Sequence, residues 1–448
     1  MLRHLLLVIT FVSAAAAAMA QPAKLTLFEQ VRIFDGEKLT LSEPMNVLVR
    51  GNVIDTISSK PITLADGEQA HVITGNGRTL MPGLIDAHWH AMLASLPMQA
   101  LLVADIGYIN LVAGQQAEQT LMRGFTSVRD LSGPAFGLKR AIDDGVIKGP
   151  RIWPSGAMIS QTGGHGDFRF PYEVPAPHNA GLNRGEATNA GVIADGVDEV
   201  RKRVREQLML GATQIKLAAG GGVSSMYDPI DVAQYSEDEF RAAVEAAENW
   251  GTYVTVHAYT SRAVQTAINA GVKVIEHGQL IDDKTAQLMA KKGVWLSVQA
   301  FIDNEFANPQ TGEARTKQQL VQAGTDRAIA MAKKHKIKLA WGTDILFNPR
   351  APKNQGAMLA TMSRWFSAPE VLRMATGTNA QLLALSGPRN PYPGQLGVVK
   401  QGALADLLLV EGNPLEDLNL IADPQRNFVV IMKDGTVYKD QSSKDQSH

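Results

Sequence analysis

Short apolar runs and longer amphipathic stretches alternate along the middle of this chain. The apolar runs are rich in β-branched and aliphatic residues, which is typical of buried strands. We predict strands at residues 81–90, 125–130 and 151–160 and at the runs that end near Lys216, His257, His277, Gln299 and Asp344. We predict helices between them at residues 198–210, 237–249, 262–270 and 282–292. Alternating strands and helices predict a parallel sheet, and this number of strands predicts an α/β fold closed as a TIM (β/α)8 barrel over residues 81–389.

The two ends of the chain carry a different pattern. Residues 21–80 contain short β-like runs such as "MNVLVRG" and "NVIDTIS", and residues 390–440 contain "ADLLLVEG" and "FVVIMKDGTVYK". Gly, Asn and Asp turn signals separate these runs. Neither segment is long enough to form a sizeable core alone. We therefore expect the two segments to pair into one small composite β-sandwich domain, followed by a polar tail at residues 441–448.

The N-terminus has the pattern of a secretory signal peptide. Arg3 precedes the apolar run "LLLVITFVSAAAAAMA", and a small-x-small triplet that ends at Ala20 offers a cleavage site. We expect residues 1–20 to be removed, the mature chain to begin at Gln21, and the protein to be exported to the periplasm or secreted. An uncleaved N-terminal anchor is the alternative. No later segment is long and charge-free enough to span a membrane.

Composition and charge narrow the functional classes. The formal charge is −1 and becomes −2 once Arg3, the only charged side chain of the leader, is removed. The sequence has no cluster of basic residues that would bind the phosphates of a nucleic-acid backbone, so nucleic acid is not an expected partner. The chain has no cysteine, which excludes a disulfide framework and lipid attachment to an N-terminal cysteine.

The ends of the predicted strands carry the candidate chemistry. Six residues stand there: His88, His90, Lys216, His257, His277 and Asp344. The first two histidines are two positions apart, so on a strand their side chains point to the same face. In a barrel the C-terminal ends of all strands meet on one rim, where active sites are built. These residues therefore predict a hydrolase site with two divalent metal ions, for which zinc is well suited, although manganese and cobalt accept the same ligands.

Lys216 needs a separate explanation, because the inside of a barrel strand solvates an ammonium group poorly. Carboxylation by CO2 would convert its amine to a carbamate anion that can bridge two cations. A lysine with a lowered pKa for Schiff-base chemistry and a lysine that extends to solvent are the alternatives. The four histidines and the aspartate at the other strand ends favour the carboxylated lysine.

Asp344 is the predicted general base. A carboxylate at the end of the last strand could ligate one metal, accept a proton from the attacking water and pass it to the leaving amine. Alone, an aspartate after a strand is commonly a turn or N-cap residue. Of the other histidines, His165 lies in the glycine-rich "SQTGGHGD" after the third strand, where backbone can approach a substrate. We assign structural or surface positions to His71, His178 and His335.

These motifs resemble the metal-dependent amidohydrolase superfamily. The likeness is carried by "MPGLIDAHWH", the lysine in "IKLAAGGG", "VHA", "EHG", "GTD" and the tail "LADLLLVEGNPLED", and it covers nearly the whole mature chain. The resemblance implies two metals with a shared ligand. The more buried metal would take His88, His90, Lys216 and Asp344, and the other would take Lys216, His257 and His277.

Finer details resemble the Xaa-Pro dipeptidase and ochratoxinase branch of this superfamily. They are "GAMISQTGGHGD", "IKLAAGGGVSSMYDP" and the spacing from the lysine to the next two ligand histidines. The resemblance implies a substrate whose leaving amine belongs to an amino acid with a free carboxylate, which requires hydrogen-bond donors or cations beyond the metals. His165 and Tyr227, on predicted rim loops, are the candidate substrate-binding residues, and Arg169 is a further candidate. A loop brace and a packed loop aromatic are the alternative roles of His165 and Tyr227.

The resulting hypothesis is an exported binuclear metal-dependent amidohydrolase that hydrolyses dipeptides or N-acyl amino acids, with ochratoxin A among the candidate substrates. Hydrolysis of a cyclic amide or lactone, as in imidazolonepropionase-like relatives, would use the same site. A non-catalytic metal-binding protein on the same barrel is the third hypothesis, and it predicts bound metal without turnover. The partners that we expect are a small-molecule or dipeptide substrate and further copies of the chain in a homo-oligomer.

Overall fold

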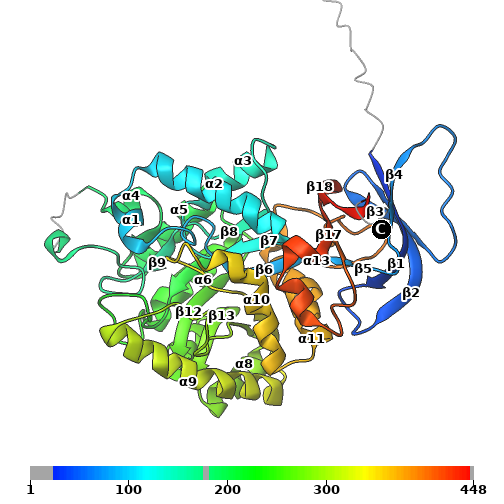
Figure 1. The fold of residues 1–448 in the computed structure, drawn as a ribbon. Coiled ribbons are helices and arrows are strands. Elements are labelled where there is room, and N and C mark those ends of the chain that lie inside the picture. The colour runs from blue at the N-terminus through cyan, green and yellow to red at the C-terminus, as the bar shows by residue number, and fades with distance from the viewer. Residues whose placement is uncertain (1–23, 175–180, 444–448) are drawn as a thin grey trace, which may run out of the picture.

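The computed structural model describes residues 24–174 and 181–443, and its larger part is a barrel of parallel strands (Figure 1). Two sheets form the barrel wall, with the strand orders β6-β7-β8 and β9-β11-β12-β13-β14-β15. A further strand, β10, pairs with the edge of β9 that faces away from β11. The strands are β6 (Leu84–Trp89), β7 (Phe125–Asp130), β8 (Arg151–Pro154), β9 (Met158–Ser160), β10 (Gly191–Ile193), β11 (Ile215–Ala218), β12 (Val254–Thr260), β13 (Val274–Leu280), β14 (Trp295–Val298) and β15 (Leu339–Trp341). The predicted TIM barrel is confirmed.

The two sheets meet at two places. The strand predicted at residues 151–160 is interrupted near Gly156, whose φ is +71°, so that its first half pairs with β7 and its second half with β11. Between β15 and β6, the main-chain N–H of Asp344 donates to the carbonyl oxygen of His88 at 2.8 Å. A Cβ on Gly342 would lie 2.3 Å from the nitrogen of His88, so this close approach of the two strands requires glycine.

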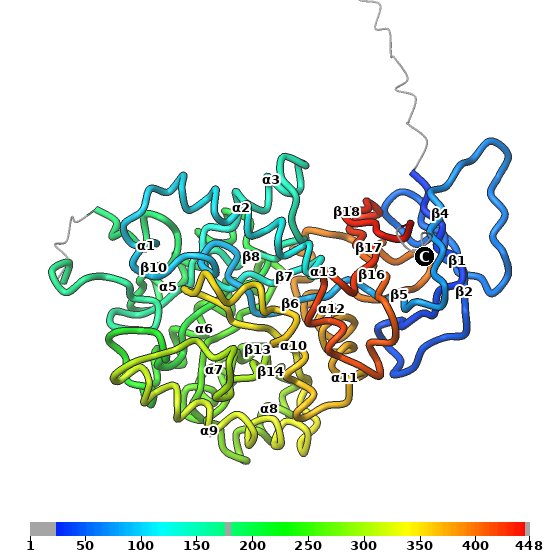
Figure 2. Tube along the Cα trace, in the orientation of Figure 1, coloured from blue at the N-terminus to red at the C-terminus, as the bar shows by residue number. Residues whose placement is uncertain are grey.

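Helices surround the barrel, and the chain continues after β15 in a series of short helices (Figures 1 and 2). The α-helices are α1 (Met98–Val103), α2 (Ile106–Met122), α3 (Ala135–Asp143), α4 (Arg184–Ala187), α5 (Val197–Leu210), α6 (Glu237–Asn249), α7 (Ser261–Asn269), α8 (Asp283–Lys292), α9 (Gly312–His335), α10 (Gln355–Ala360), α11 (Ala368–Arg373), α12 (Asn379–Leu383) and α13 (Pro424–Asn427). Short 3-10 or π segments are η1 (Pro171–Glu173), η2 (Pro352–Asn354), η3 (Thr361–Arg364), η4 (Met374–Thr378), η5 (Ala384–Arg389) and η6 (Leu418–Ile421).

Local sequence explains where the helices begin and end. α6 begins with a capping box, in which the Ser236 hydroxyl accepts from the N–H of Glu239 and the Glu239 carboxylate accepts from the N–H of Ser236. α8 is capped by Asp282, which accepts a main-chain N–H of the first turn at 2.7 Å, and ends at Gly293 in the left-handed conformation. The helix predicted at residues 237–249 coincides with α6, and the other three predicted helices agree to within one residue at each end.

Strands from both ends of the chain form a further sheet beside the barrel (Figure 2). Its order is β18-β17-β16-β5-β1-β2-β3, with β4 paired to β1. The strands are β1 (Leu25–Phe34), β2 (Leu41–Arg50), β3 (Val53–Ser58), β4 (Ala70–Thr74), β5 (Thr79–Pro82), β16 (Leu407–Val410), β17 (Phe428–Lys433) and β18 (Thr436–Asp440). β16 runs antiparallel to β5, with Leu409 opposite Leu80, and Phe28 and Val430 share one buried core. The terminal segments thus pair as expected, while the exact domain boundaries stay a prediction.

Two residues lie in a different sheet from the one expected. Met81 and Pro82, predicted in the first barrel strand, belong to β5 of the terminal sheet. The chain changes sheets at Gly83, whose N–H donates to the carbonyl oxygen of Asp406 at 2.8 Å, and the barrel strand begins at Leu84. A Cβ on Gly83 would lie 2.1 Å from Oγ1 of Thr126, so only glycine fits at this crossing. A single apolar run therefore serves two sheets, a division that hydrophobicity alone does not reveal.

Within the described part of the chain, no helix combines the length and the apolar character needed to cross a membrane. The predicted signal peptide at residues 1–20, the predicted mature start at Gln21, the last residues of the polar tail and His178 lie outside the described residues. His71 and His335 lie outside the cavity described below, each beside a carboxylate, at 2.7 and 2.8 Å respectively.

Candidate metal centre and active-site cavity

A cavity lies at the C-terminal ends of the barrel strands, and all six predicted metal-binding residues line it. They are His88 and His90 at the end of β6, Lys216 on β11, His257 on β12, His277 on β13 and Asp344 shortly after β15. The cavity offers about 150 Å³ to the centres of water-sized molecules, roughly ten times what one water needs. The barrel thus gathers into one place residues that are scattered along the chain.

His88, His90 and Asp344 form the tightest part of this cluster. Nε2 of His88 lies 3.1 Å, and Nε2 of His90 lies 3.0 Å, from Oδ1 of Asp344. One ligand atom from each residue lies within 4.8 Å of the other two, so the three side chains can hold one ion. The two histidines reach the same carboxylate because they are two positions apart on the chain.

His257 and His277 lie on neighbouring strands, with ring centroids 4.5 Å apart. Nε2 of His257 lies 3.1 Å from the carbonyl oxygen of Gly221, and Nδ1 of His277 lies 2.7 Å from Oε1 of Gln299. Each ring therefore donates one N–H to an oxygen and keeps a lone pair on its other nitrogen. Burial lowers the pKa of His257 well below its ordinary value and that of His277 to about 3, so both rings are neutral near pH 7.

Lys216 lines the same cavity with 2% of its surface exposed. Burial lowers its pKa from 10.5 to about 8, although the negative charges of Glu276 and Asp344 act in the opposite direction. These two carboxylates act on the amine through charge alone, without a hydrogen bond. The amine is therefore buried near carboxylates that do not bind it directly.

Two residues of the cluster have a backbone conformation that side chains other than glycine rarely adopt. The φ angle is +84° at His277 and +56° at Asp344. Such residues cost about 1–3 kcal/mol each and concentrate at functional sites. The fold thus holds these two side chains in the cavity against a local preference of the chain.

The donor set fits divalent cations. Imidazole and carboxylate groups suit zinc and also accept manganese or cobalt. Nδ1 of His88 lies 2.9 Å from Oε2 of Glu276, so this ring too has one nitrogen engaged by an oxygen and the other turned toward the cluster. Nδ1 of His90 is buried and has no hydrogen-bond partner among the described residues.

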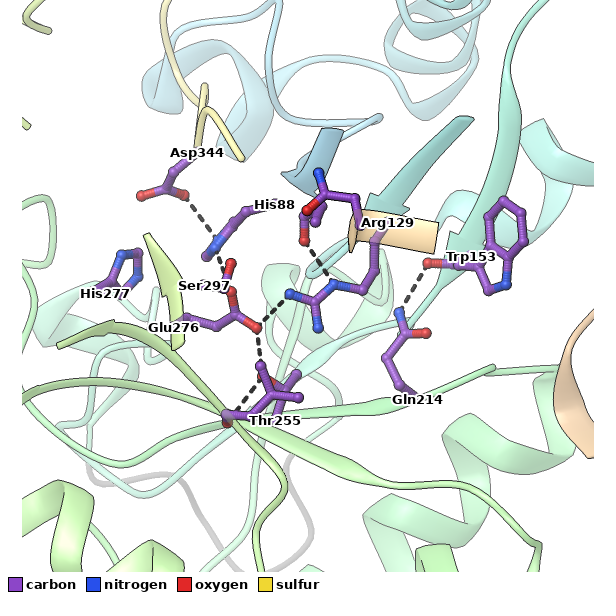
Figure 3. A network of polar contacts seen from close by, with 12 residues as sticks. His88, Arg129, Trp153, Gln214, Thr255, Glu276, His277, Ser297 and Asp344 are labelled. Atoms are coloured by element: carbon purple, nitrogen blue, oxygen red, sulfur yellow. Dashed lines mark hydrogen bonds and ion pairs between the residues drawn. The ribbon is translucent and has the colours of Figure 1, made fainter. Parts of the chain in front are cut away.

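Glu276 and Arg129 form a buried charged network beside the cluster that was not predicted (Figure 3). Glu276 accepts from Arg129 at 2.7 Å and from the Thr255 hydroxyl at 2.5 Å, and it contacts His88. Burial alone would raise the pKa of Glu276, but Arg129 and His88 outweigh it and hold the pKa well below its ordinary value. The available signal was a charged residue next to the apolar part of each strand run, Glu276 in "KVIEHG" and Arg129 in "TSVRD".

His165, a predicted substrate-binding residue, lines the cavity beside the histidine cluster. Its ring stacks on that of His257, with centroids 3.9 Å apart and planes inclined by 18°. Its Nδ1 lies 3.0 Å from the hydroxyl oxygen of Ser225. A Cβ on Gly222 would lie 1.9 Å from this nitrogen, so the glycine run after β11 makes room for the imidazole.

Tyr227 and Arg169, the other predicted substrate-binding residues, are not among the described residues that line the cavity. The guanidinium of Arg169 donates to the carboxylate of Asp167 at 2.9 and 2.6 Å. The hydroxyl of Tyr227 donates to the main-chain carbonyl of Arg169. Because both polar groups are engaged by the protein itself, and the tyrosine joins the loop after β11 to the one after β9, the arrangement favours a bracing role, and substrate binding by these two residues stays a prediction.

Tyr259 lines the cavity although the sequence did not single it out. Its ring centroid lies 5.0 Å from those of both His257 and His277. The signal was the period of a strand, because Tyr259 follows His257 by two positions on β12 and so shares its face. Its hydroxyl is a candidate hydrogen-bond donor for a ligand next to the metal-binding residues.

Much of the remaining cavity wall is apolar. One part comes from segments that follow β6 and β15 and includes Leu93 and Phe347, and another comes from the segment after β14 and includes Phe301 and Phe306. Among the described residues that line the cavity, Lys216 is the only lysine and there is no arginine. The walls therefore fit a ligand with large apolar groups.

Comparisons with known proteins agree with this geometry. Residues 79–439 match the model of the amidohydrolase family. Ochratoxinase from Aspergillus niger is 34% identical over 380 residues, which cover 80% of this chain and 75% of that protein. Among solved structures, a prolidase complexed with N-methylphosphonate-L-proline is 35% identical, with a TM-score of 0.84 over 93% of this chain and 100% of that one. The structure of the A. niger ochratoxinase is 28% identical, with a TM-score of 0.81 over 94% of this chain and 96% of that one.

The family match covers most of the chain, and the similarity to ochratoxinase extends over barrel and terminal strands alike. The chain therefore belongs to the amidohydrolase family of metal-dependent enzymes, and it is a hydrolase that acts on amide bonds.

Proposed function

We propose that this enzyme is a binuclear amidohydrolase that cleaves dipeptides or N-acyl amino acids with a free C-terminal carboxylate. The observation that carries the proposal is the convergence of His88, His90, Lys216, His257, His277 and Asp344 on one cavity. Relatives described as ochratoxinase and prolidase support hydrolysis of an amide next to an amino acid. Ochratoxin A is accordingly one of the candidate substrates.

The proposed metal ligands divide into two overlapping sets. One set is His88, His90, Lys216 and Asp344, and the other is Lys216, His257 and His277. Support comes from the imidazoles of His88, His257 and His277, each of which has one nitrogen engaged by an oxygen and the other available as a lone-pair donor. We propose zinc for both sets because it prefers nitrogen and carboxylate ligands.

Lys216 belongs to both sets because we propose that it is carboxylated. Its neutral amine would attack the carbon of CO2 and lose a proton, which yields a carbamate anion with two ligating oxygens. The support is the position of the amine, which is buried and makes no hydrogen bond to the carboxylates of Glu276 and Asp344. A carbamate would give the buried Lys216 side chain the negative charge that balances two neighbouring cations.

Bound divalent cations polarise a carbonyl and lower the pKa of water. In the proposed reaction Asp344 accepts a proton from the water that attacks the carbonyl carbon, and it returns this proton to the amine nitrogen as the C–N bond breaks. Asp344 is suited to this exchange because its Oδ1 lies within 3.1 Å of Nε2 of both His88 and His90, at the centre of the cluster.

The apolar cavity walls support a substrate with a large apolar group on at least one side of the amide. His165 and Tyr259 are the proposed donors to substrate oxygens, since both line the cavity beside the cluster. No arginine is found among the described lining residues, so we propose that neutral donors and the metals are the main groups that receive the substrate carboxylate.

The absence of arginine from the described lining residues also favours a second candidate function, hydrolysis of an uncharged cyclic amide or lactone. A cavity whose described lining holds no cationic side chain other than Lys216 accommodates an uncharged ligand without leaving a buried charge unpaired. The two functions share the catalytic groups and differ in whether the substrate must carry a carboxylate.

A hydrolysis panel with matched substrate pairs tests the proposal. The zinc-loaded enzyme is given Xaa-Pro, Xaa-Phe and Xaa-Lys/Arg dipeptides, N-acyl amino acids and ochratoxin A, each also as its C-terminal methyl ester or amide, together with lactones and cyclic amides. We expect the free acids to have the higher kcat/KM. Equal rates on the capped forms, or activity on the cyclic compounds alone, would instead support the second candidate function.

Export, removal of residues 1–20 and assembly into a homo-oligomer remain part of the proposal. They rest on the N-terminal sequence pattern and on the expected properties of the chain. N-terminal sequencing of the protein secreted from its host would test cleavage before Gln21, and light scattering of the purified enzyme would give its oligomeric state.

A further inference from the structure

Glu276 is a fully buried carboxylate whose contacts connect the metal-binding cluster to the barrel interior (Figure 3). Its Oε2 lies 2.9 Å from Nδ1 of His88. Its Oε1 accepts from the guanidinium of Arg129 at 2.7 Å and from the hydroxyl of Thr255 at 2.5 Å. A buried charge is tolerated when it is paired and hydrogen-bonded, and both oxygens of this carboxylate are engaged.

Arg129 links this carboxylate to the strand that carries His88. Its Nε donates to the carbonyl oxygen of Ala87 at 2.6 Å, while its other nitrogens donate to Glu276 and, at 3.2 Å, to the hydroxyl of Tyr253. Ala87 directly precedes His88 in β6. One rigid guanidinium therefore holds both the backbone beside the histidine and the carboxylate that contacts its ring.

The second half of the cluster has a different kind of support. Nδ1 of His277 lies 2.7 Å from Oε1 of Gln299, which is a neutral amide, and Nε2 of the same amide lies 3.4 Å from Nδ1 of His88, farther than the 2.9 Å to Glu276. A hydrogen bond to a carboxylate is stronger than one to a neutral amide. The two halves of the cluster are therefore held unequally, since His88 faces an anionic acceptor and His277 a neutral one.

We propose that Glu276 is a positioning residue that fixes the tautomer and the orientation of His88, and that it strengthens cation binding by the set His88, His90 and Asp344. Because Nδ1–H donates to Glu276, the lone pair remains on Nε2, the atom that lies 3.1 Å from Asp344. Arg129 holds the carboxylate in this position. This inference rests on the proposed two-metal function and names a group outside both ligand sets.

The test is zinc binding by the Glu276→Gln variant of the full-length enzyme. An amide has one acceptor oxygen where the carboxylate has two, so either Arg129 or His88 then faces an N–H group. We expect one of the two zinc dissociation constants, measured by competition with a chromophoric chelator, to rise about 10- to 100-fold while the other stays close to that of the wild type. Metal analysis after dialysis should then show loss of one zinc.

Two variants serve as controls. Thr255→Val removes one hydrogen bond to Glu276 but leaves its contact with His88, so both zinc constants should stay near the wild-type values. Gln299→Met removes the acceptor for His277 at 2.7 Å and only a long contact, 3.4 Å, with His88, so it should weaken mainly the other zinc constant. Loss of the same zinc in the Glu276 and Gln299 variants would contradict the assignment of Glu276 to the His88 set.

Unchanged zinc constants in Glu276→Gln, with only a lower melting temperature, would overturn the inference and leave Glu276 a structural role. If this variant does not fold, Glu276→Asp keeps the charge and shortens the side chain. It should weaken the same constant, and wild-type affinity in that variant would overturn the inference. Absence of zinc binding by the wild type would contradict the proposed function instead, so the two failures are distinguishable.

Discussion

The main-chain N–H of Asp344 donates to the carbonyl oxygen of His88 at 2.8 Å, and Oδ1 of the same aspartate lies 3.1 Å from Nε2 of the same histidine. The first contact joins the strands β15 and β6 and closes the barrel. The second belongs to the metal-binding cluster. Because one pair of residues makes both contacts, closure of the barrel and the geometry of the cluster depend on each other.

Removal of the metals should therefore destabilise the fold as well as abolish hydrolysis. A ligand that binds only the native state stabilises it by about 2.7 kcal/mol when its free concentration is one hundred times Kd. We expect chelation to lower the melting temperature in scanning calorimetry and readdition of zinc to restore both stability and activity. A metal-free enzyme that melts at the holoenzyme temperature would contradict the coupling.

Asp344→Asn should lower kcat by about 10²- to 10⁴-fold, the usual contribution of a general acid–base group, while most of the zinc is retained. The amide preserves the shape of the side chain but cannot accept the proton of the attacking water. Asp326→Asn is the matched control, because Asp326 is an exposed partner of Arg364. Near-normal turnover by the Asp344 variant would exclude its proposed role.

Lys216→Ala should lose activity and at least one zinc, and it separates the carbamate from the alternatives for this lysine. Acetate added to the variant replaces the missing carboxylate group and should restore part of the zinc content and turnover. Methylammonium, which replaces an amine, should not. Restoration by methylammonium rather than by acetate would favour an amine function, such as Schiff-base chemistry.

Gly222→Ala should displace the imidazole of His165, because the new Cβ would lie 1.9 Å from its Nδ1. A displacement of this kind can cost about 100-fold in rate when the ring positions a substrate. We expect kcat/KM to fall while zinc content stays near two per chain. Gly137→Ala in α3 is the control, since a Cβ there meets nothing within 4 Å. Unchanged kcat/KM in the Gly222 variant would assign His165 the bracing role.

The chain pattern by itself determined the barrel and the location of the cluster. Short apolar runs between amphipathic stretches identify a strand-and-helix alternation, and the closed barrel then brings all strand ends to one rim. His88 and His90 share a face because of the two-residue period of a strand, a local property. These features follow from the local pattern of residues and from the order of strands and helices, and both can be inferred from the sequence.

Only the tertiary structure decided which buried groups meet. Glu276 and Arg129 stand 147 positions apart, and their pairing depends on distances across the barrel interior that no local pattern encodes. Likewise Tyr259 lines the cavity while the hydroxyl of Tyr227 donates to the carbonyl of Arg169 on another loop, because the packing of the rim decides where each ring points. The local chain therefore determined which chemical groups reach the rim, and packing across the barrel decided their partners and orientation.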